Sequence, residues 1–191
     1  MAVLLLQHRD LHWGNVLVQT EEKQCKLSES NFAVETLADP QAAGIRATII
    51  DFTLSRVNAL EGQEPAVSSD GVLYDKMAGD ELFEGHGDIQ FDVYRQMRQA
   101  TKGEWHTFEP VTNLLWLRYL VTKLIENKGL KVSAKRKSAK SGAASAIERL
   151  SYENLCRTRE KLEVLSRVES DVADPTLGGA SDLWKAMASE A

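Results

Sequence analysis

Cysteines and long apolar runs are scarce in this sequence of 191 residues. Its two cysteines, Cys25 and Cys156, belong to no CxxC pair or Cys/His cluster, so we expect no zinc site. Two isolated thiols are typical of a reducing compartment, which predicts nuclear or cytoplasmic localisation. The apolar run at residues 3–6 is too short for a signal-peptide core or a membrane span, so we expect no membrane partner.

Positive charge is not in excess either. The chain has 23 Lys and Arg residues against 28 Asp and Glu residues, a formal net charge of −5. This balance argues against direct nucleic-acid readout. Residues 128–144 differ, because basic side chains alternate there with Ser, Ala and Gly and few large apolar residues occur. This composition predicts a mobile basic insertion, and a nuclear-targeting or phosphate-contacting patch is the alternative.

Hydrophobic periodicity predicts a small β-hairpin followed by helices. Apolar and β-branched residues at 15–19 and 47–52 indicate two short strands, with a polar surface insertion between them. Helical spacing of apolar residues indicates helices over 88–100, from Thr112 to a stop at Gly129, over 143–168, and a short one from Ser181. Residues 56–79 lack clear periodicity. The pattern predicts a mostly α-helical α+β chain.

One motif near the start carries chemistry. Residues 8–15 read HRDLHWGN, which matches the HRDLxxxN catalytic loop of protein kinases at every fixed position. A buried-type strand further along leads into Asp51-Phe52-Thr53, where protein kinases carry the metal-binding Asp-Phe-Gly. Separately, each of these residues would usually be a turn or cap residue. Their order and flanking strands together indicate a kinase-like fold.

The residue types suit phosphoryl transfer. The reaction needs a carboxylate that orients the attacking hydroxyl and accepts its proton, and ligands that hold Mg²⁺ on the ATP phosphates. Asp10 is the candidate base. Asn15 and Asp51 are the candidate Mg²⁺ ligands, since this ion prefers hard oxygen donors and keeps several waters. We therefore expect ATP and Mg²⁺ as cofactors.

Further segments resemble the haspin family of protein kinases. They are DFTLSR at 51–56, LFEGHGDIQFDVYR at 82–95 and NLLWLRYL at 113–120. The resemblance implies a serine/threonine kinase that phosphorylates a threonine in a histone tail. It also implies a protein-kinase C-lobe with a catalytic loop at 8–15, a metal-binding motif at 51–53, a substrate-side segment at 54–92 and a helical region at 88–191.

Within the catalytic loop, the resemblance groups Arg9 and His12 with Asp10. His12 stands where most protein kinases place a phosphate-contacting Lys, so it is a candidate phosphate donor or else a structural histidine. The stretch from Leu11 to Asn15 also fits small-molecule phosphotransferases of the aminoglycoside and choline type. Arg9 favours haspin, because that branch usually carries Gly there. A catalytically inactive fragment that binds histone tails is a third possibility.

Acidic residues dominate the segment after the metal-binding motif. Residues 75–92 hold six acids and one Lys, which would attract a basic peptide. Asp80 and Glu81, with Asp75, are the candidate contacts for the basic residues of the substrate. Asp88 and Asp92 are expected to be structural, since acids suit a helix start and an Asp here binds the catalytic-loop backbone in kinases.

Only seven residues precede His8. A kinase N-lobe supplies a Gly-rich loop, a strand Lys and a Glu that pairs with it, and these have no room there. We therefore expect a C-lobe with the N-lobe absent, and an isolated chain that is inactive.

Overall fold

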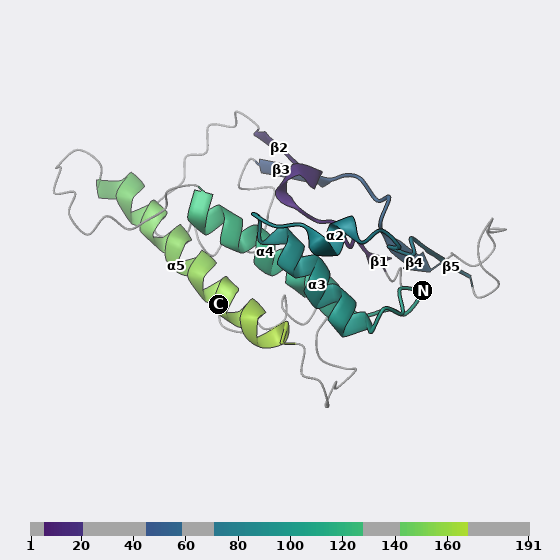
Figure 1. The fold of residues 1–191 in the computed structure, drawn as a ribbon. Coiled ribbons are helices and arrows are strands. Elements are labelled where there is room, and N and C mark those ends of the chain that lie inside the picture. Colours follow the sequence, from purple (N-terminus) through teal and green to yellow (C-terminus); the bar gives the residue numbers. More distant parts are fainter. Residues whose placement is uncertain (1–5, 21–44, 59–70, 128–141, 168–191) are drawn as a thin grey trace.

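The structure is a computed structural model that describes residues 6–20, 45–58, 71–127 and 142–167. Two small sheets lie at one end of a group of helices (Figure 1). The elements, in chain order, are β1 (Leu6–Gln7), the 3₁₀ helix η1 (Trp13–Asn15), β2 (Val16–Thr20), β3 (Ile45–Ile49), β4 (Arg56–Asn58), β5 (Val72–Tyr74), α2 (Glu81–Glu84), α3 (Gln90–Thr101), α4 (Val111–Asn127) and α5 (Gly142–Leu165). This α+β architecture is compatible with a kinase-like fold.

The first sheet is the expected hairpin. Strands β2 and β3 pair antiparallel from Val16 opposite Ile49 to Thr20 opposite Ile45. The prediction placed the second strand at 47–52, but β3 ends at Ile49. The reason is local: Asp51 has a φ of 60°, a left-handed conformation that cannot continue a strand.

The second sheet was not predicted. It has the order β1-β4-β5, with Leu6 opposite Val57 and Val57 opposite Leu73. Strands β4 and β5 come from the stretch at 56–79 in which no periodicity was found. Two- and three-residue strands are too short to display an alternating pattern, so their pairing depends on distant partners.

Helices α3, α4 and α5 confirm the periodicity and lie side by side in that order (Figure 1). Trp116 on α4 is fully buried in their core. It contacts Tyr94 and Tyr119 edge-on, at ring-centroid distances of 5.2 and 5.4 Å. Its indole N–H donates to the sulfur of Met97 on α3, at 3.0 Å. This aromatic cluster fixes α3, which carries residues toward the catalytic loop.

Some expectations fall outside the described residues. They are the insertion after residue 20, most of the basic segment at 128–144, and the short helix at Ser181. Among the described residues, no helix is long and apolar enough to cross a membrane.

Candidate active site

The loop that follows β1 is held from inside the molecule by Arg9. This residue has a φ of 65° and no exposed surface. Its guanidinium donates to the backbone oxygens of Trp105 and, at 3.5 Å, Asp75. Burial, and next the nearby charge of Arg56, lower its pKa to about 10. Arg9, which the sequence groups with the catalytic side chains, thus lies beneath the loop and ties it to residues 75 and 105.

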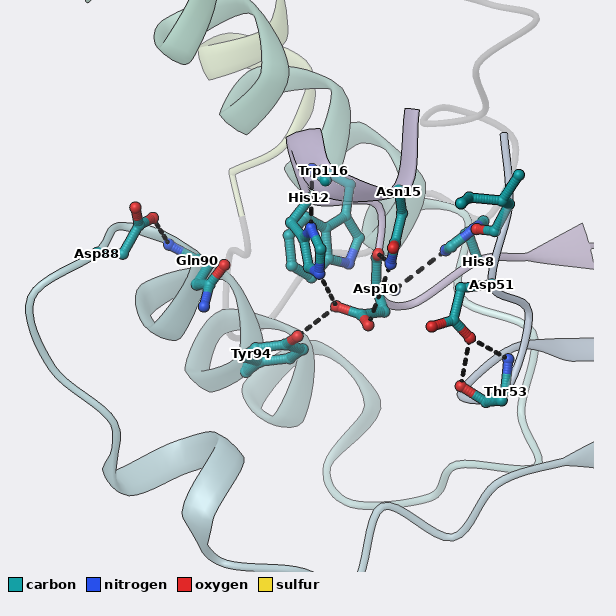
Figure 2. Close-up of polar contacts among 12 residues, drawn as sticks. His8, Asp10, His12, Asn15, Asp51, Thr53, Asp88, Gln90, Tyr94 and Trp116 are labelled. Atoms are coloured by element: carbon teal, nitrogen blue, oxygen red, sulfur yellow. Dashed lines mark hydrogen bonds and ion pairs between the residues drawn. The ribbon is translucent and has the colours of Figure 1, made fainter. Parts of the chain in front are cut away.

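The carboxylate of Asp10 is held by donors from two different elements (Figure 2). The hydroxyl of Tyr94 on α3 donates to its Oδ1. The side-chain amide of Asn15 donates to its Oδ2 at 3.3 Å and to its backbone oxygen at 2.8 Å. The side chain is 14% exposed, so it is mostly desolvated but still reaches solvent. Such a carboxylate can accept a proton from a molecule bound beside it.

Asn15 joins the loop to the hairpin. Its backbone oxygen accepts a hydrogen bond from the N–H of Ile50, at 3.0 Å, just past the end of β3. Its side chain is buried, and the amide nitrogen is the atom that faces Asp10. This orientation leaves the amide oxygen as the atom available to a cation.

Asp51 follows β3 of the hairpin and is exposed to solvent. Its Oδ1 accepts hydrogen bonds from the Thr53 hydroxyl, at 2.7 Å, and from the Thr53 N–H, at 3.3 Å. These two bonds lower the pKa of the Asp51 carboxyl. His8 braces the same turn, because its ring contacts Phe52 at 4.9 Å and its Nε2 lies 3.0 Å from the backbone oxygen of Ile50. Figure 2 shows Asp10, Asn15 and Asp51 around one space, as the strand pairing predicts.

His12 lies at the start of η1, on the opposite side of Asp10 from Asp51 (Figure 2). Its Nδ1 accepts from the N–H of Gly14 at 3.0 Å, and its Nε2 lies 3.9 Å from Oδ1 of Asp10. A Cβ on Gly14 would lie only 2.9 Å from the His12 ring, so glycine permits this approach. The side chain of His12 is therefore both a helix cap and a partly exposed neighbour of the base.

The available oxygens fit Mg²⁺ shared with ATP better than a metal held by the protein alone. The described residues contain no group of three or more His, Cys, Asp or Glu side chains that could hold a metal. The amide oxygen of Asn15 and the carboxylate of Asp51 are hard oxygen ligands, and both residues border the same space as Asp10 (Figure 2). Mg²⁺ is commonly bound in this way, with one or two protein ligands completed by phosphates and water.

Comparison with known proteins places the chain in a family. A family model described as "Haspin like kinase domain" matches residues 4–174. The chain belongs to the haspin-like kinase family. This membership separates it from the small-molecule phosphotransferases that the catalytic loop alone left open.

Three relatives show how much of a haspin protein this chain represents. It is 38% identical to serine/threonine-protein kinase haspin of Mus musculus, over 72% of this chain and 17% of that protein. It is 36% identical to a haspin homolog of Schizosaccharomyces pombe, over 65% of this chain and 27% of that protein. For the Arabidopsis thaliana homolog the values are 34%, 70% and 21%. The chain thus spans about a quarter or less of these relatives.

The substrate-side segment of this haspin-like chain carries exposed acids on a fixed support. Asp80 and Glu81 are exposed at the start of α2, and Asp75 is exposed just after β5. The Oδ1 of Asp75 accepts from the N–H of Met77 at 2.6 Å. Helix α2 is held by Phe83, which is buried and stacks on Trp105 at 6.1 Å. Asp80 and Glu81 therefore lie at the start of a short helix that Phe83 anchors in the core.

Asp88 and Asp92 lie at the start of α3, as expected, but within the described residues neither is hydrogen-bonded to the catalytic-loop backbone. Asp88 forms an ion pair with Lys123 of α4 at 2.5 Å and accepts from the N–H of Gln90 at 2.9 Å. Asp92 is exposed and pairs with Arg95 at 2.6 Å. Within the described residues, the contact from α3 to the catalytic loop is made by Tyr94 instead.

Tyr94 is the residue of this site that sequence reasoning missed. It falls within the helix predicted at 88–100, but the sequence alone indicates no partner for its hydroxyl. A buried tyrosine hydroxyl usually finds a hydrogen-bond partner, and that rule was the available signal. The identity of the partner could not be read from the sequence, because Asp10 lies 84 positions away.

Proposed function

We propose that this chain is the catalytic part of a serine/threonine protein kinase. It transfers the γ-phosphoryl group of ATP to a threonine or serine in a basic protein tail, and the family resemblance points to the tail of a histone. The observation that carries the proposal is the arrangement of Asp10, Asn15 and Asp51 around one space. The names of the relatives support the same class of reaction.

In this proposal, Asp10 orients the substrate hydroxyl and accepts its proton as the oxygen attacks the γ-phosphorus. The bond to the β-phosphate oxygen breaks, and ADP leaves. Asn15 and Asp51 would hold Mg²⁺, which would offset the negative charge of the phosphates. His12, beside Asp10, is placed to donate to a phosphate oxygen. Little covalent help is asked of the protein, so positioning supplies most of the rate.

The acids of the substrate-side segment give the proposal its substrate class. Asp75, Asp80 and Glu81 are exposed and carry one sign of charge. Exposed carboxylates attract a Lys- or Arg-rich tail and speed its encounter. A histone tail has this chemistry and is found in the nucleus, the localisation that we propose along with the cytoplasm.

The test is phosphate transfer by the full-length protein. With labelled ATP, Mg²⁺ and a histone H3 tail peptide, we expect incorporation of label that depends on the metal. Asp10→Asn should reduce the rate by about 10²-fold or more, the range for loss of a general base. Asp92→Asn makes the same chemical change on α3, where the carboxylate pairs with Arg95 three residues on, and should keep the rate.

Two outcomes would contradict the proposal in different ways. Tail binding with no transfer, unchanged by Asp10→Asn, would favour the inactive tail-binding fragment. Transfer to aminoglycosides or choline in preference to the peptide would favour a small-molecule phosphotransferase.

A further inference from the structure

A buried tyrosine hydroxyl lies against the candidate base. Tyr94, in the middle of α3, is 3% exposed, and its hydroxyl donates to Oδ1 of Asp10 (Figure 2). Its neighbours hold the ring in place: Trp116 contacts it edge-on at 5.2 Å, and Phe91 lies at 6.4 Å. The oxygen therefore has a fixed position that the core of the helical region determines.

The hydroxyl is a lasting donor. Burial first, and then the hydrogen bond to Asp10 and the charge of that carboxylate, raise the pKa of Tyr94 well above its ordinary value. The proton therefore stays on the tyrosine throughout the neutral range. A carboxylate accepts only, so the direction of this hydrogen bond is settled as well.

An aspartate side chain needs such donors if its carboxylate is to keep one orientation. The torsion that turns the carboxylate plane is broad and roughly two-fold, so the Asp10 side chain alone does not fix the plane. Tyr94 holds Oδ1 from α3, and Asn15 holds Oδ2 from the catalytic loop. Each oxygen has further lone-pair capacity, so both donors can be present while a substrate hydroxyl donates as well.

We propose that Tyr94 is a positioning residue that fixes the plane of the Asp10 carboxylate for the transfer of the substrate proton. The proposal rests on the proposed kinase function. Tyr94 acts through Asp10 and does not touch the substrate, since it is almost fully buried. Its hydroxyl should therefore matter for the chemical step and not for binding of peptide or ATP.

The first experiment is Tyr94→Phe in the full-length protein, which removes the hydroxyl and keeps the ring between Phe91 and Trp116. We expect kcat to fall about tenfold, less than for loss of the base itself, because misplacement alone can slow a reaction strongly. The KM values for peptide and ATP should stay within about twofold, since positioning acts on the transition state. A purely structural role would not separate kcat from KM in this way.

Tyr119→Phe is the matched control. Tyr119 is also buried and contacts Trp116 edge-on at 5.4 Å, from α4. Within the described residues, the Asp10 side chain accepts from Tyr94 and Asn15, and Tyr119 is not among its donors. Its kcat should match that of the unaltered protein. An equal loss of kcat in both variants would overturn the proposal, because the effect would then follow core packing.

A second measurement tests the contact without relying on activity. In a double-mutant cycle with Asp10→Ala, the fall in melting temperature caused by Tyr94→Phe should be smaller than in the unaltered protein, since the acceptor is already gone. Equal shifts in both backgrounds would show that the two side chains do not interact and would overturn the proposal.

The remaining outcomes separate this proposal from the kinase function. Transfer that is lost in Asp10→Asn but unchanged in Tyr94→Phe would overturn the role of Tyr94 alone. Absence of transfer in the unaltered full-length protein would overturn the kinase function, and this inference with it.

Discussion

The hydroxyl of Tyr94 donates a hydrogen bond to Oδ1 of Asp10 and so links α3 to the catalytic loop. The two residues are 84 positions apart in the chain. The ring of Tyr94 is in turn packed on Trp116 of α4. The position of the candidate base therefore depends on the packing of two helices as well as on the loop that carries it. A change in that packing should therefore shift the Asp10 carboxylate through its hydrogen bond with Tyr94.

The ion pair between Asp88 and Lys123 should stabilise the join between α3 and α4. Its side chains are 31% and 14% exposed, and Lys123 also faces the rings of Trp13 and Tyr119 at 5.9 and 5.5 Å. Asp88→Asn should lower the free energy of unfolding by about 1–2 kcal/mol, between the values for exposed and buried pairs. Urea unfolding at pH 7 measures this change.

The control is Asp92→Asn at the same end of α3. Asp92 is 58% exposed and pairs with Arg95 three residues on, so its loss should cost about 0.5 kcal/mol or less. Equal losses for the two substitutions would contradict the assignment of the stabilising pair to Asp88.

The stability that the pair of Asp88 and Lys123 contributes should depend on pH. Burial alone would raise the pKa of the Asp88 carboxyl, but hydrogen bonds from Lys123 and Gln90 and the charge of Lys123 lower it below its ordinary value of 3.8. A lowered pKa in the folded state means that the contribution is complete above about pH 4 and is lost as the pH falls further. The unaltered protein should therefore exceed Asp88→Asn in stability by the full difference at pH 7, and urea unfolding at decreasing pH should show this gap narrowing below about pH 4.

Thr53 should hold the pKa of Asp51 below its ordinary value. The hydroxyl and the N–H of Thr53 both donate to the Asp51 carboxylate, and these bonds lower its pKa. Thr53→Val removes the hydroxyl but keeps the shape and the N–H, so the pKa should rise toward the ordinary value. At pH 7 the carboxylate stays charged in both proteins. The measurable effect is an acid limb of the pH–rate profile that moves to higher pH; a limb that stays in place would contradict this role.

The acids at the start of α2 should set the affinity for a basic tail. Reversing both charges, with Asp80→Lys and Glu81→Lys, should weaken binding of a histone-tail peptide to the full-length protein by about tenfold or more at low salt. The loss should shrink as salt rises, because exposed charges are screened. Fluorescence anisotropy of a labelled peptide measures both effects.

Glu126→Lys with Glu160→Lys is the matched charge reversal. These residues are exposed and belong to α4 and α5, not to α2. This control changes the net charge equally, so it should leave most of the affinity intact. Equal weakening by both pairs would mean that the peptide senses total charge and that α2 has no special part.

The parts of the fold that could be predicted are those that local pattern determines. The long apolar stripes placed α3, α4 and α5, and the β-branched runs placed β2 and β3, because each segment carries enough residues to show its period. Strands β4 and β5 have three residues each, and they pair with each other and with β1, which is distant in sequence. The end of β3 was missed because the left-handed conformation of Asp51 is a backbone feature that apolar patterning does not reveal.

The candidate site also has a part that the local sequence pattern predicts and a part that it does not. The motif spacing predicted that Asp10, Asn15 and Asp51 would face one space, since loop and hairpin are adjacent in sequence and in structure. The two contacts that the motif could not indicate are Tyr94 with Asp10 and Asp88 with Lys123, which span 84 and 35 positions. Periodicity indicates which face of a helix is buried, but it does not indicate which polar atom of another element contacts that face.

The chain of 191 residues should transfer phosphate at least about 10²-fold more slowly than Mus musculus haspin, of which it matches 17%, because positioning carries most of the catalysis in this reaction. Exposed apolar side chains near the site support this expectation. Leu17 on β2 and Phe52 beside Asp51 are 54% and 49% exposed, and in a two-lobed kinase such residues would be covered by the other lobe. Ile49 is 46% exposed as well, but it shares the opposite face of the hairpin with Val16. Asp51 is open to water as well, which weakens each charge interaction in the site.

The same exposed surface predicts self-association of the isolated chain. Leu17→Lys should lower light scattering and shift the elution volume toward the monomer, without restoring transfer. The activity assay uses purified 1–191 with Mg²⁺, labelled ATP and a histone-tail peptide, beside Asp10→Asn. Robust transfer that disappears in Asp10→Asn would show that Asp10, Asn15 and Asp51 need no further cover, and that the apolar surface around Leu17 has no part in holding the nucleotide.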